Sequence, residues 1–450
     1  MLKNIKRILI ANRGEIAVRA IRSVRELGGE SIAIYSEADR DSMHQKLADI
    51  SICIGAPPTE QSYLNIPSIL AAVEITNADA IYPGYGFLAE NPRFAEICEK
   101  SEIKFIGPPS QTIKLTGDKA AAREAAIEAG VPVIPGSPPV KTLKDALKSA
   151  KEIGYPVLIK AAAGGGGRGM RVAHNEQELT RLLPIAQREA ETSFGDSRVY
   201  IEKFILDPKH VEVQILADEY GNVIYLGDRE CSIQRRHQKL LEESPSPFIT
   251  QEIRKKMGDA AVKFAKHVNF IGAGTVEFIV DKQMNFYFIE MNGRIQVEHP
   301  VTEMVTGIDI VAWQLKIADG QKLTINQKDI NLKGHSIEFR INAENPNTFI
   351  PNPGTVEKLY LPGGYGIRVD THIYQGYKIP PYYDSLVAKL IVWGKDREEA
   401  IRRGRRALKE FILKGFDTTI PFHKKILQDK EFLDGSYTTT LVDSKYIKSK

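Results

Sequence analysis

The sequence predicts an α/β protein, α+β over its whole length, that is divided into several domains. An apolar run over residues 7–11, a helical pattern that ends near Leu27 and a second apolar run over residues 31–36 form a strand–helix–strand unit, which is typical of a parallel sheet. After about residue 207 the apolar runs come in hairpin-like pairs, which are typical of antiparallel strands. The 450 residues, 42% of them hydrophobic, suffice for about three domains.

Residues 1–110 are expected to form a doubly wound parallel sheet. Gly28 and Gly29 end the first helix, because glycine readily adopts the left-handed conformation at a helix C-terminus. Further strands are centred near Ile52, Ile81 and Phe105, with helical stretches between them.

The rest of the chain is expected to contain a small α+β unit followed by antiparallel strands. A helix over residues 118–129 leads into a Pro-rich linker over residues 131–140. The small unit has strands at 156–161, 170–173 and 198–205 and helices at 142–153 and from 176 onward. The strand pairs that follow are 211–218 with 222–231 and 273–281 with 285–292, and the final helix is expected over residues 396–413.

Composition and charge exclude several classes of protein. The formal net charge is only +4, so the overall charge does not indicate a nucleic-acid-binding protein. The three cysteines, Cys53, Cys98 and Cys231, lie far apart without metal-type spacing, so we expect reduced thiols in a cytoplasmic protein. No window reaches the roughly 18–20 apolar residues of a membrane span. The basic stretch 397–409 is better explained as an amphipathic surface helix than as a nucleic-acid binding element.

A glycine run occupies residues 164–167 and continues, after Arg168, with Gly169. Glycine lets backbone N–H groups approach an anion closely. No Lys-Ser/Thr follows, and the next element is a strand, so the run matches neither a P-loop nor a dinucleotide fingerprint. The sequence therefore favours a flap that closes over phosphates, with Lys160 on the incoming strand as a point charge; a solvent-exposed hairpin tip is the alternative.

Two glutamates, Glu277 and Glu290, lie inside otherwise apolar strands. If the turn is centred on residues 283–284, the two face each other across the hairpin with Cβ atoms about 4.5–5.5 Å apart, where like charges repel. A hard divalent cation such as Mg²⁺ would relieve that repulsion. Asn292 follows on the same face as Glu290. The alternative is an edge hairpin whose carboxylates are both solvated.

Two polar segments complete the candidate site. In residues 292–300, Arg294 is suited to oxyanion recognition and Glu298 to taking a proton from a bound acid. Residues 232–239 form a basic cluster directly after a strand, and in isolation this cluster would be interpreted as a solvated turn.

The chain resembles the biotin carboxylase family of the ATP-grasp superfamily. The motifs match in family order and cover nearly the whole chain. They are ANRGEIAVR (11–19), YPGYGFLAEN (82–91), FIGP (105–108), GDK (117–119), GGGGRGM (164–170), DRECSIQRRHQK (228–239), EMNGRIQVEHPVTE (290–303), RINAE (340–344) and PPYYDS (380–385).

The resemblance implies an ATP-grasp fold and a ligase that carboxylates biotin. The implied domains are a Rossmann-like preATP-grasp domain over residues 1–115, a linker helix with a mobile glycine-loop lid over 116–205, and a mixed α+β domain over 206–450. The implied reaction uses ATP, Mg²⁺ or Mn²⁺ and bicarbonate, proceeds through carboxyphosphate, and gives N1′-carboxybiotin on a biotinyl carrier protein.

The same resemblance implies a set of site residues. The expected ATP contacts are Lys119, Lys160, Gly165, Gly166, Glu202, Lys203, Ile205, His210, Gln234 and His237. The expected metal ligands are Glu277 and Glu290, with Asn292 close by. The expected bicarbonate site is Lys239, Arg294, Gln296 and Val297, with Glu298 as the base. The expected biotin contacts are Tyr85, Asp384 and Arg340, the last of which steadies the biotin enolate.

One position departs from the family pattern. The family usually carries Thr, Pro or Ala between Asn292 and Arg294, whereas this chain has Gly293. Glycine loosens the backbone there, so the resemblance fixes the placement of Arg294 least firmly. We nevertheless expect activity.

No biotin acceptor sequence and no carboxyltransferase domain are recognised, so both are expected on separate chains. Acetyl-CoA carboxylase in fatty-acid synthesis is the expected host complex, with the corresponding subunit of a two-chain pyruvate or propionyl-CoA carboxylase as the alternative. A homodimer is expected from the family. Two more distant alternatives are another ATP-grasp ligase, which would lack QVEHPVTE and the RINAE arginine, and a non-catalytic nucleotide-binding regulator, which would be expected to lack Glu298, Lys239 or Arg340.

Overall fold

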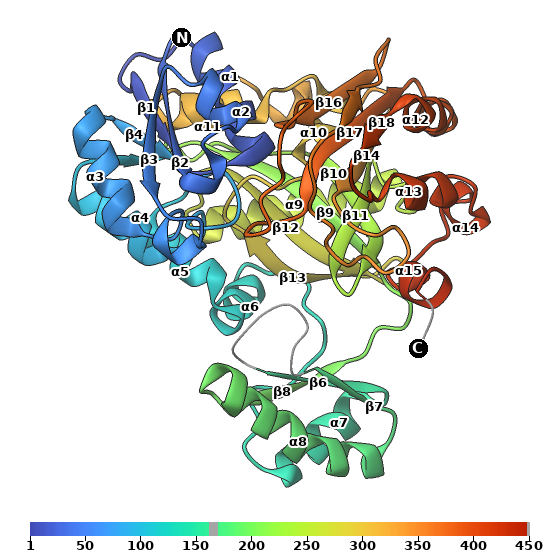
Figure 1. Ribbon diagram of the computed structural model, residues 1–450. Helices are drawn as coiled ribbons and strands as arrows, with labels where there is room; N and C mark the ends of the chain where they lie inside the picture. Colours follow the sequence, from blue (N-terminus) through green and yellow to red (C-terminus); the bar gives the residue numbers. More distant parts are fainter. Residues whose placement is uncertain (162–169, 448–450) are drawn as a thin grey trace.

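The N-terminal part of the chain forms a parallel sheet with helices on its faces. The computed structural model describes residues 1–161 and 170–447 (Figure 1). The five strands lie in the order β3-β2-β1-β4-β5 and all pair in parallel, which confirms the predicted α/β class. The strands are β1 Arg7–Ile10, β2 Glu30–Ser36, β3 Ile50–Gly55, β4 Ala80–Tyr82 and β5 Lys104–Phe105, and the helices are α1 Gly14–Glu26, α2 Met43–Leu47, α3 Ile66–Thr76, α4 Pro92–Lys100 and α5 Ser110–Gly117.

Side-chain caps fix where several helices begin. The side chains of Asn65, Asn91 and Asp118 accept backbone N–H groups at the starts of α3, α4 and α6 (Lys119–Glu128), which satisfies donors that the first turn leaves free. The α6 cap confirms the helix predicted after Asp118.

A smaller three-stranded antiparallel sheet stands apart from the body of the molecule in Figure 1. Its strand order is β7-β6-β8, and helices α7 and α8 pack on it. The bounds are β6 Val157–Ala161, β7 Arg171–Ala173, β8 Val199–Lys203, α7 Leu143–Ile153 and α8 Glu176–Phe194. The predicted strands before and after the glycine run are therefore present and paired. The run itself, with Gly165 and Gly166, lies outside the described residues.

The candidate site is carried by an eight-stranded antiparallel sheet in the order β13-β12-β9-β10-β11-β14-β17-β16. Its strands are β9 Lys209–Ala217, β10 Val223–Arg235, β11 Gln238–Ser244, β12 Gly272–Val280, β13 Phe286–Asn292, β14 His335–Asn342, β16 Ile367–Thr371 and β17 Leu386–Gly394. The neighbouring helices are α9 Gln251–His267, α10 His299–Thr306, α11 Ile310–Ala318 and α12 Arg397–Glu410. Buried apolar residues on the strands, α9 and α12 form the cores.

Two sequence predictions in this part were wrong. The basic cluster 232–239 does not follow a strand; β10 runs on to Arg235, the chain turns at Arg236 and His237 with positive φ, and β11 begins at Gln238. The final predicted helix, 396–413, ends at Glu410, and residues 412–414 instead form β18 (Ile412–Lys414), which pairs with β15 (Lys358–Tyr360). Helices α13 Ile420–Ile426, α14 Lys430–Leu433 and α15 Leu441–Lys445 follow it.

Within residues 1–161 and 170–447, none of the helices combines the length and the apolar character that a membrane span requires.

Candidate functional site

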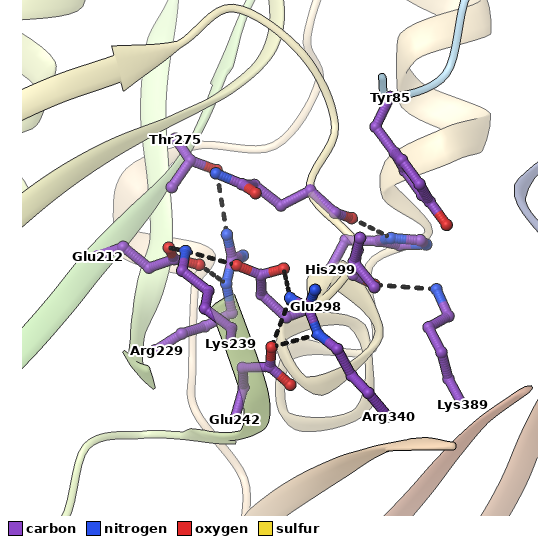
Figure 2. A network of polar contacts seen from close by, with 12 residues as sticks. Tyr85, Glu212, Arg229, Lys239, Glu242, Thr275, Glu298, His299, Arg340 and Lys389 are labelled. Atoms are coloured by element: carbon purple, nitrogen blue, oxygen red, sulfur yellow. Dashed lines mark hydrogen bonds and ion pairs between the residues drawn. The ribbon is translucent and has the colours of Figure 1, made fainter. Parts of the chain in front are cut away.

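The ammonium group of Lys239 lies among three buried carboxylates, two of which, Glu212 and Glu298, are labelled in Figure 2. Its Nζ is 2.5 Å from Glu212, 3.1 Å from Glu277 and 2.8 Å from Glu298. Burial alone would lower the pKa of Lys239, but the three carboxylates outweigh burial and hold it well above the usual value. Lys239 is therefore a fixed positive charge.

Glu298 is fully buried and lies between two cations. Its Oε1 accepts from Lys239, and its Oε2 accepts from Arg340 Nη2 at 2.8 Å. Burial acts to raise the pKa of Glu298, but Lys239, Arg340 and Arg229 together hold it well below the ordinary value. Glu298 is thus ionised, which is the form that can accept a proton.

Glu277 and Glu290 face each other across β12 and β13, as the sequence predicted, but the turn differs from the expected one. Val280 pairs with Phe286, so the turn is centred on residue 283 alone, and a register shift between Glu277 and Phe278 brings the two glutamates opposite each other. The Glu277 carboxylate is 2.8 Å from His210 and accepts hydrogen bonds of 3.0 Å from both Asn292 and Gln296. Burial would raise the pKa of Glu277, yet Lys239 and His210 lower it. Glu290 is one-third exposed, and Lys119 lies 3.4 Å from its Oε2. The two carboxylates thus differ in solvation and in partners.

Arg294 is fixed from several sides despite the glycine before it. Its guanidinium donates to Glu90 at 2.8 Å, to Asn292 at 2.9 Å and to Gln296 at 3.4 Å. The same Glu90 accepts the backbone N–H of Gly293 at 2.9 Å. Glu90 therefore contacts both residues of the segment that Gly293 is expected to loosen.

A second group of predicted residues lines a small cavity between the three-stranded sheet (β6 and β8) and strand β13 of the eight-stranded sheet. Lys160 Nζ on β6 is 3.3 Å from Glu202 on β8, and Lys119 and Arg123 of α6 reach the same cavity. Lys119 also pairs with Glu290, so this cavity adjoins the carboxylate pair. Lysines and arginine gathered beside two carboxylates can accommodate a polyphosphate together with a metal ion.

The remaining predicted nucleotide contacts are more scattered. Lys203 donates to the carbonyls of Gly154 and Tyr155, so its ammonium is engaged with the connection between α7 and β6. Gln234 on β10 lies directly opposite Lys239, while His237 is exposed at the turn and Ile205 is half-buried just after β8.

The predicted biotin contacts come from three separate segments. The Tyr85 hydroxyl donates to Glu15 at 2.5 Å, and Asp384 is exposed and caps the backbone N–H of Leu386 at 2.9 Å. Burial raises the pKa of Tyr85 well above its usual value, and Asp384 and Arg340 are both close enough to influence it. Tyr85, Asp384 and Arg340 therefore share one region.

Sequence analysis missed several charged residues of this site. Buried Arg229 pairs with Glu212 and donates to Thr275 at 3.0 Å, and Arg340 Nε donates to Glu242 at 2.6 Å (Figure 2). A local signal was available for Glu212, which lies between two valines on β9 in the same way as Glu277 lies between apolar residues on β12. Arg229 is flanked by two acidic residues and Glu242 is followed by Glu243, so neither stood out. Applied throughout the chain, the criterion that fits Glu212 also identifies Lys389 and Glu338.

Comparisons with known proteins agree along the whole chain. Residues 4–113 match the family described as biotin carboxylase, N-terminal domain, residues 118–326 the ATP-binding domain of the carbamoyl-phosphate synthase L chain, and residues 338–444 the biotin carboxylase C-terminal domain.

Two curated relatives and one solved structure show the extent of the similarity. Biotin carboxylase 1 of Bacillus subtilis is 56% identical over 443 residues, covering 98% of each chain. A pyruvate carboxylase subunit of Methanothermobacter thermautotrophicus is 54% identical over 439 residues, covering 97% of this chain and 89% of that protein. The biotin carboxylase domain dimer of Hydrogenobacter thermophilus 2-oxoglutarate carboxylase, solved with MgADP, ADP and bicarbonate, superposes with a TM-score of 0.93 at 51% identity and covers 100% of both chains. This chain belongs to the biotin carboxylase family.

Proposed function

We propose that this protein catalyses the ATP- and bicarbonate-dependent carboxylation of biotin through carboxyphosphate, giving N1′-carboxybiotin, ADP and phosphate. The observation that carries the proposal is the position of Glu298 between Lys239 and Arg340. Glu298 thereby contacts both Lys239, which is proposed to bind bicarbonate, and Arg340, which is proposed to bind biotin, so bicarbonate activation and biotin carboxylation can take place beside one residue.

Lys239, Arg294, Gln296 and the Val297 segment are proposed to bind bicarbonate beside Glu298. Bicarbonate is a poor electrophile and a weak acid, so it must be both deprotonated and phosphorylated. Cations beside it lower its pKa, which compensates for the low basicity of Glu298. Bicarbonate then transfers its proton to Glu298, and its freed oxygen attacks the terminal phosphate of ATP.

Lys119, Lys160, Glu202, Lys203, Ile205, His210, Gln234 and His237 are proposed to bind ATP together with Gly165 and Gly166. The cavity between the small sheet and β13 supports this assignment for Lys119, Lys160 and Glu202. The supporting architecture is the separate small sheet, which we propose to be part of a lid over residues 116–205, between a preATP-grasp domain over 1–115 and a catalytic domain over 206–450.

Glu277 and Glu290 are proposed to hold Mg²⁺ or Mn²⁺, with Asn292 close by. Two opposed carboxylates, one of them partly exposed, form the oxygen-rich and incompletely enclosed donor set that Mg²⁺ takes up together with phosphates. A bound Mg²⁺ would neutralise phosphate charge during transfer.

Arg340, Tyr85 and Asp384 are proposed to bind biotin presented by a biotinyl carrier protein. Carboxyphosphate breaks down to CO₂ and phosphate, biotin N1′ gives its proton to that phosphate, and N1′ then attacks CO₂. The negative charge that develops on the ureido oxygen requires a nearby cation, and a guanidinium supplies one without changing its own protonation.

The test is the Glu298→Gln variant. Removing the base should lower bicarbonate-dependent ATP cleavage by about 10²- to 10⁴-fold while ATP binding persists. Glu230→Gln is the matched control, because Glu230 is also a buried carboxylate of the same sheet but contacts Ser232 and Ser246 instead. Unchanged turnover in Glu298→Gln would contradict the proposal.

We propose acetyl-CoA carboxylase as the host complex, with a separate carboxyltransferase, a homodimeric arrangement and a cytoplasmic location. The free thiols of Cys53, Cys98 and Cys231 support a reducing compartment, and the dimer of the Hydrogenobacter biotin carboxylase domain supports the oligomeric state. The second candidate is a two-chain pyruvate carboxylase, which the Methanothermobacter relative favours. Isolating the complex from its native cell and assaying the co-purifying transferase with acetyl-CoA and with pyruvate separates the two.

A further inference from the structure

Two neighbouring cations of the large sheet hold two consecutive residues of the segment that carries Glu298. Arg340 on β14 and Lys389 on β17 lie directly opposite each other, so their side chains leave the same face of the sheet. Arg340 contacts the Glu298 carboxylate, and Lys389 Nζ donates to the Val297 carbonyl at 2.9 Å. The backbone just before the proposed base is thus fixed by a lysine that has no other assigned role.

Lys389 also connects this segment to the N-terminal domain. Its Nζ lies 3.1 Å from Oε1 of Glu15, the second residue of α1, and both side chains are almost fully buried. The same Oε1 accepts the Tyr85 hydroxyl at 2.5 Å. A single carboxylate oxygen therefore contacts both the lysine that holds residue 297 and the tyrosine proposed to contact biotin; Figure 2 shows Tyr85, Lys389 and Glu298 in one view.

Stability alone does not account for this buried ion pair. Two charges removed from water lose solvation that their attraction only partly restores, and well-packed apolar residues are often as stable. Burial would lower the pKa of Lys389, but the carboxylates around it, Glu15 foremost, raise it, so the lysine stays charged. Burial raises the pKa of Tyr85, so its hydroxyl keeps the proton that it donates to Glu15.

We infer that Glu15 and Lys389 are positioning residues that set the bicarbonate-binding segment and the biotin-binding Tyr85 in fixed relation to each other. This inference rests on the function proposed above. It assigns the N-terminal domain a direct part in the reaction site, because α1 supplies the carboxylate that joins the two substrate regions.

The kinetic test uses Lys389→Met, Glu15→Leu and Glu15→Gln in the full-length chain. Lys389→Met should raise the KM values for bicarbonate and for biotin by about 10- to 100-fold, the effect of losing a hydrogen bond to a charged group, and should leave the KM for ATP unchanged. Glu15→Gln keeps an oxygen that accepts from Tyr85 and Lys389, so it should retain more activity than Glu15→Leu.

Arg397→Met is the matched control. It also removes a cation from a buried carboxylate, Glu243, but Arg397 contacts neither residue 297 nor Tyr85. A rise in the KM for ATP equal to the rise for bicarbonate, or the same kinetic pattern in Arg397→Met, would overturn the inference and indicate a structural role.

A crystal structure of Lys389→Met tests the positioning directly and without turnover. The Val297 carbonyl and the Tyr85 ring should both shift from their wild-type places; if both stay in place, the inference is wrong. Wild-type protein that shows no bicarbonate-dependent ATP cleavage would instead refute the proposed function, and the crystallographic result would still decide the positioning role.

Discussion

The large sheet contains two pairs of directly opposed glutamates with very different electrostatics. Glu277 lies opposite Glu290 on β12 and β13, and Glu242 lies opposite Glu338 on β11 and β14. Directly opposed carboxylates in an antiparallel sheet repel each other. Each pair therefore needs a cation, a proton or water to exist in the folded protein.

The pairs differ in which of these they have. The Glu277 carboxylate contacts Lys239 and His210. The Glu290 carboxylate contacts Lys119 and is partly exposed to solvent. Glu242 is fully buried with Arg340 as its cation, and burial raises its pKa to about 7. Both carboxyl oxygens of Glu338 lack a hydrogen-bond partner among the described residues, and burial together with Glu242 raises the pKa of Glu338 well above its usual value.

This difference shows that register alone does not identify a metal site. The first pair has nearby cations and an open side, so it can stay ionised and receive a metal with its phosphates. The second pair is closed off from solvent, and burial outweighs the nearby Arg340 and Lys389, so it keeps a proton. We therefore interpret the first pair as binding a metal ion. We interpret the second pair as holding the Arg340 guanidinium in place through Glu242.

The largest expected effect comes from removing a carboxylate of the first pair. Even the loss of an outer-shell partner typically costs about 10- to 100-fold in metal affinity or activity, so Glu290→Gln should lower ATP cleavage by about 100-fold or more. Titrating activity against Mg²⁺ and Mn²⁺ should show a raised metal requirement. Glu219→Gln, which changes an exposed carboxylate paired with Lys104, is the control. If the Glu290→Gln variant had a normal metal requirement, the first pair would not bind the metal ion, and the two pairs would no longer differ in function.

A smaller effect is expected from the second pair, acting through Arg340. Glu242→Ala removes the oxygen that accepts from Arg340 Nε, so the guanidinium loses one of its two carboxylate partners. We expect kcat/KM for biotin to fall about tenfold or more with the KM for ATP unchanged. Glu242→Gln retains an acceptor oxygen and should recover most of the loss. Equal loss in both variants would show that charge, and not placement of Arg340, is what Glu242 provides.

Local sequence signals predicted the first pair but not the second. Glu277 and Glu290 share one hairpin, so their proximity could be predicted locally, although a register shift after Glu277 is needed to place them directly opposite each other. Glu242 and Glu338 come from strands nearly one hundred residues apart, and Glu15 meets Lys389 only when α1 packs against β17. These contacts depend on tertiary assembly, which periodicity does not encode.

The same limit explains the error at the end of the last predicted helix. No Gly or Pro occurs between residue 410 and Gly415, so nothing local predicts a stop at Glu410. Residues 412–414 become β18 because they pair with β15, a partner more than fifty residues earlier in the chain. A distant strand partner thus overrides the local helical preference.

The smallest effect, on stability, distinguishes the pairs most directly. An unfolded glutamate releases its proton near pH 4.5, whereas a folded one with a raised pKa keeps it to higher pH. Between those values the folded state binds more protons, so stability falls as pH rises, by at most about 1.4 kcal/mol per pH unit for one group. Glu338→Gln abolishes this titration, because the amide resembles the protonated acid. The variant should match wild type near pH 5 and exceed it by about 1 kcal/mol near pH 8 in urea denaturation.

Glu243→Gln provides the opposite sign for comparison. Glu243 adjoins Glu242 on β11, but Arg397 and His335 hold its pKa below the ordinary value in spite of burial. Its ionised form therefore contributes stability that is present at all pH values above about 4.5. Glu243→Gln should destabilise the protein at both pH 5 and pH 8. If Glu338→Gln behaved in the same way, the second pair would be ionised like the first, and charge balance would no longer explain why one pair suits a metal and the other does not.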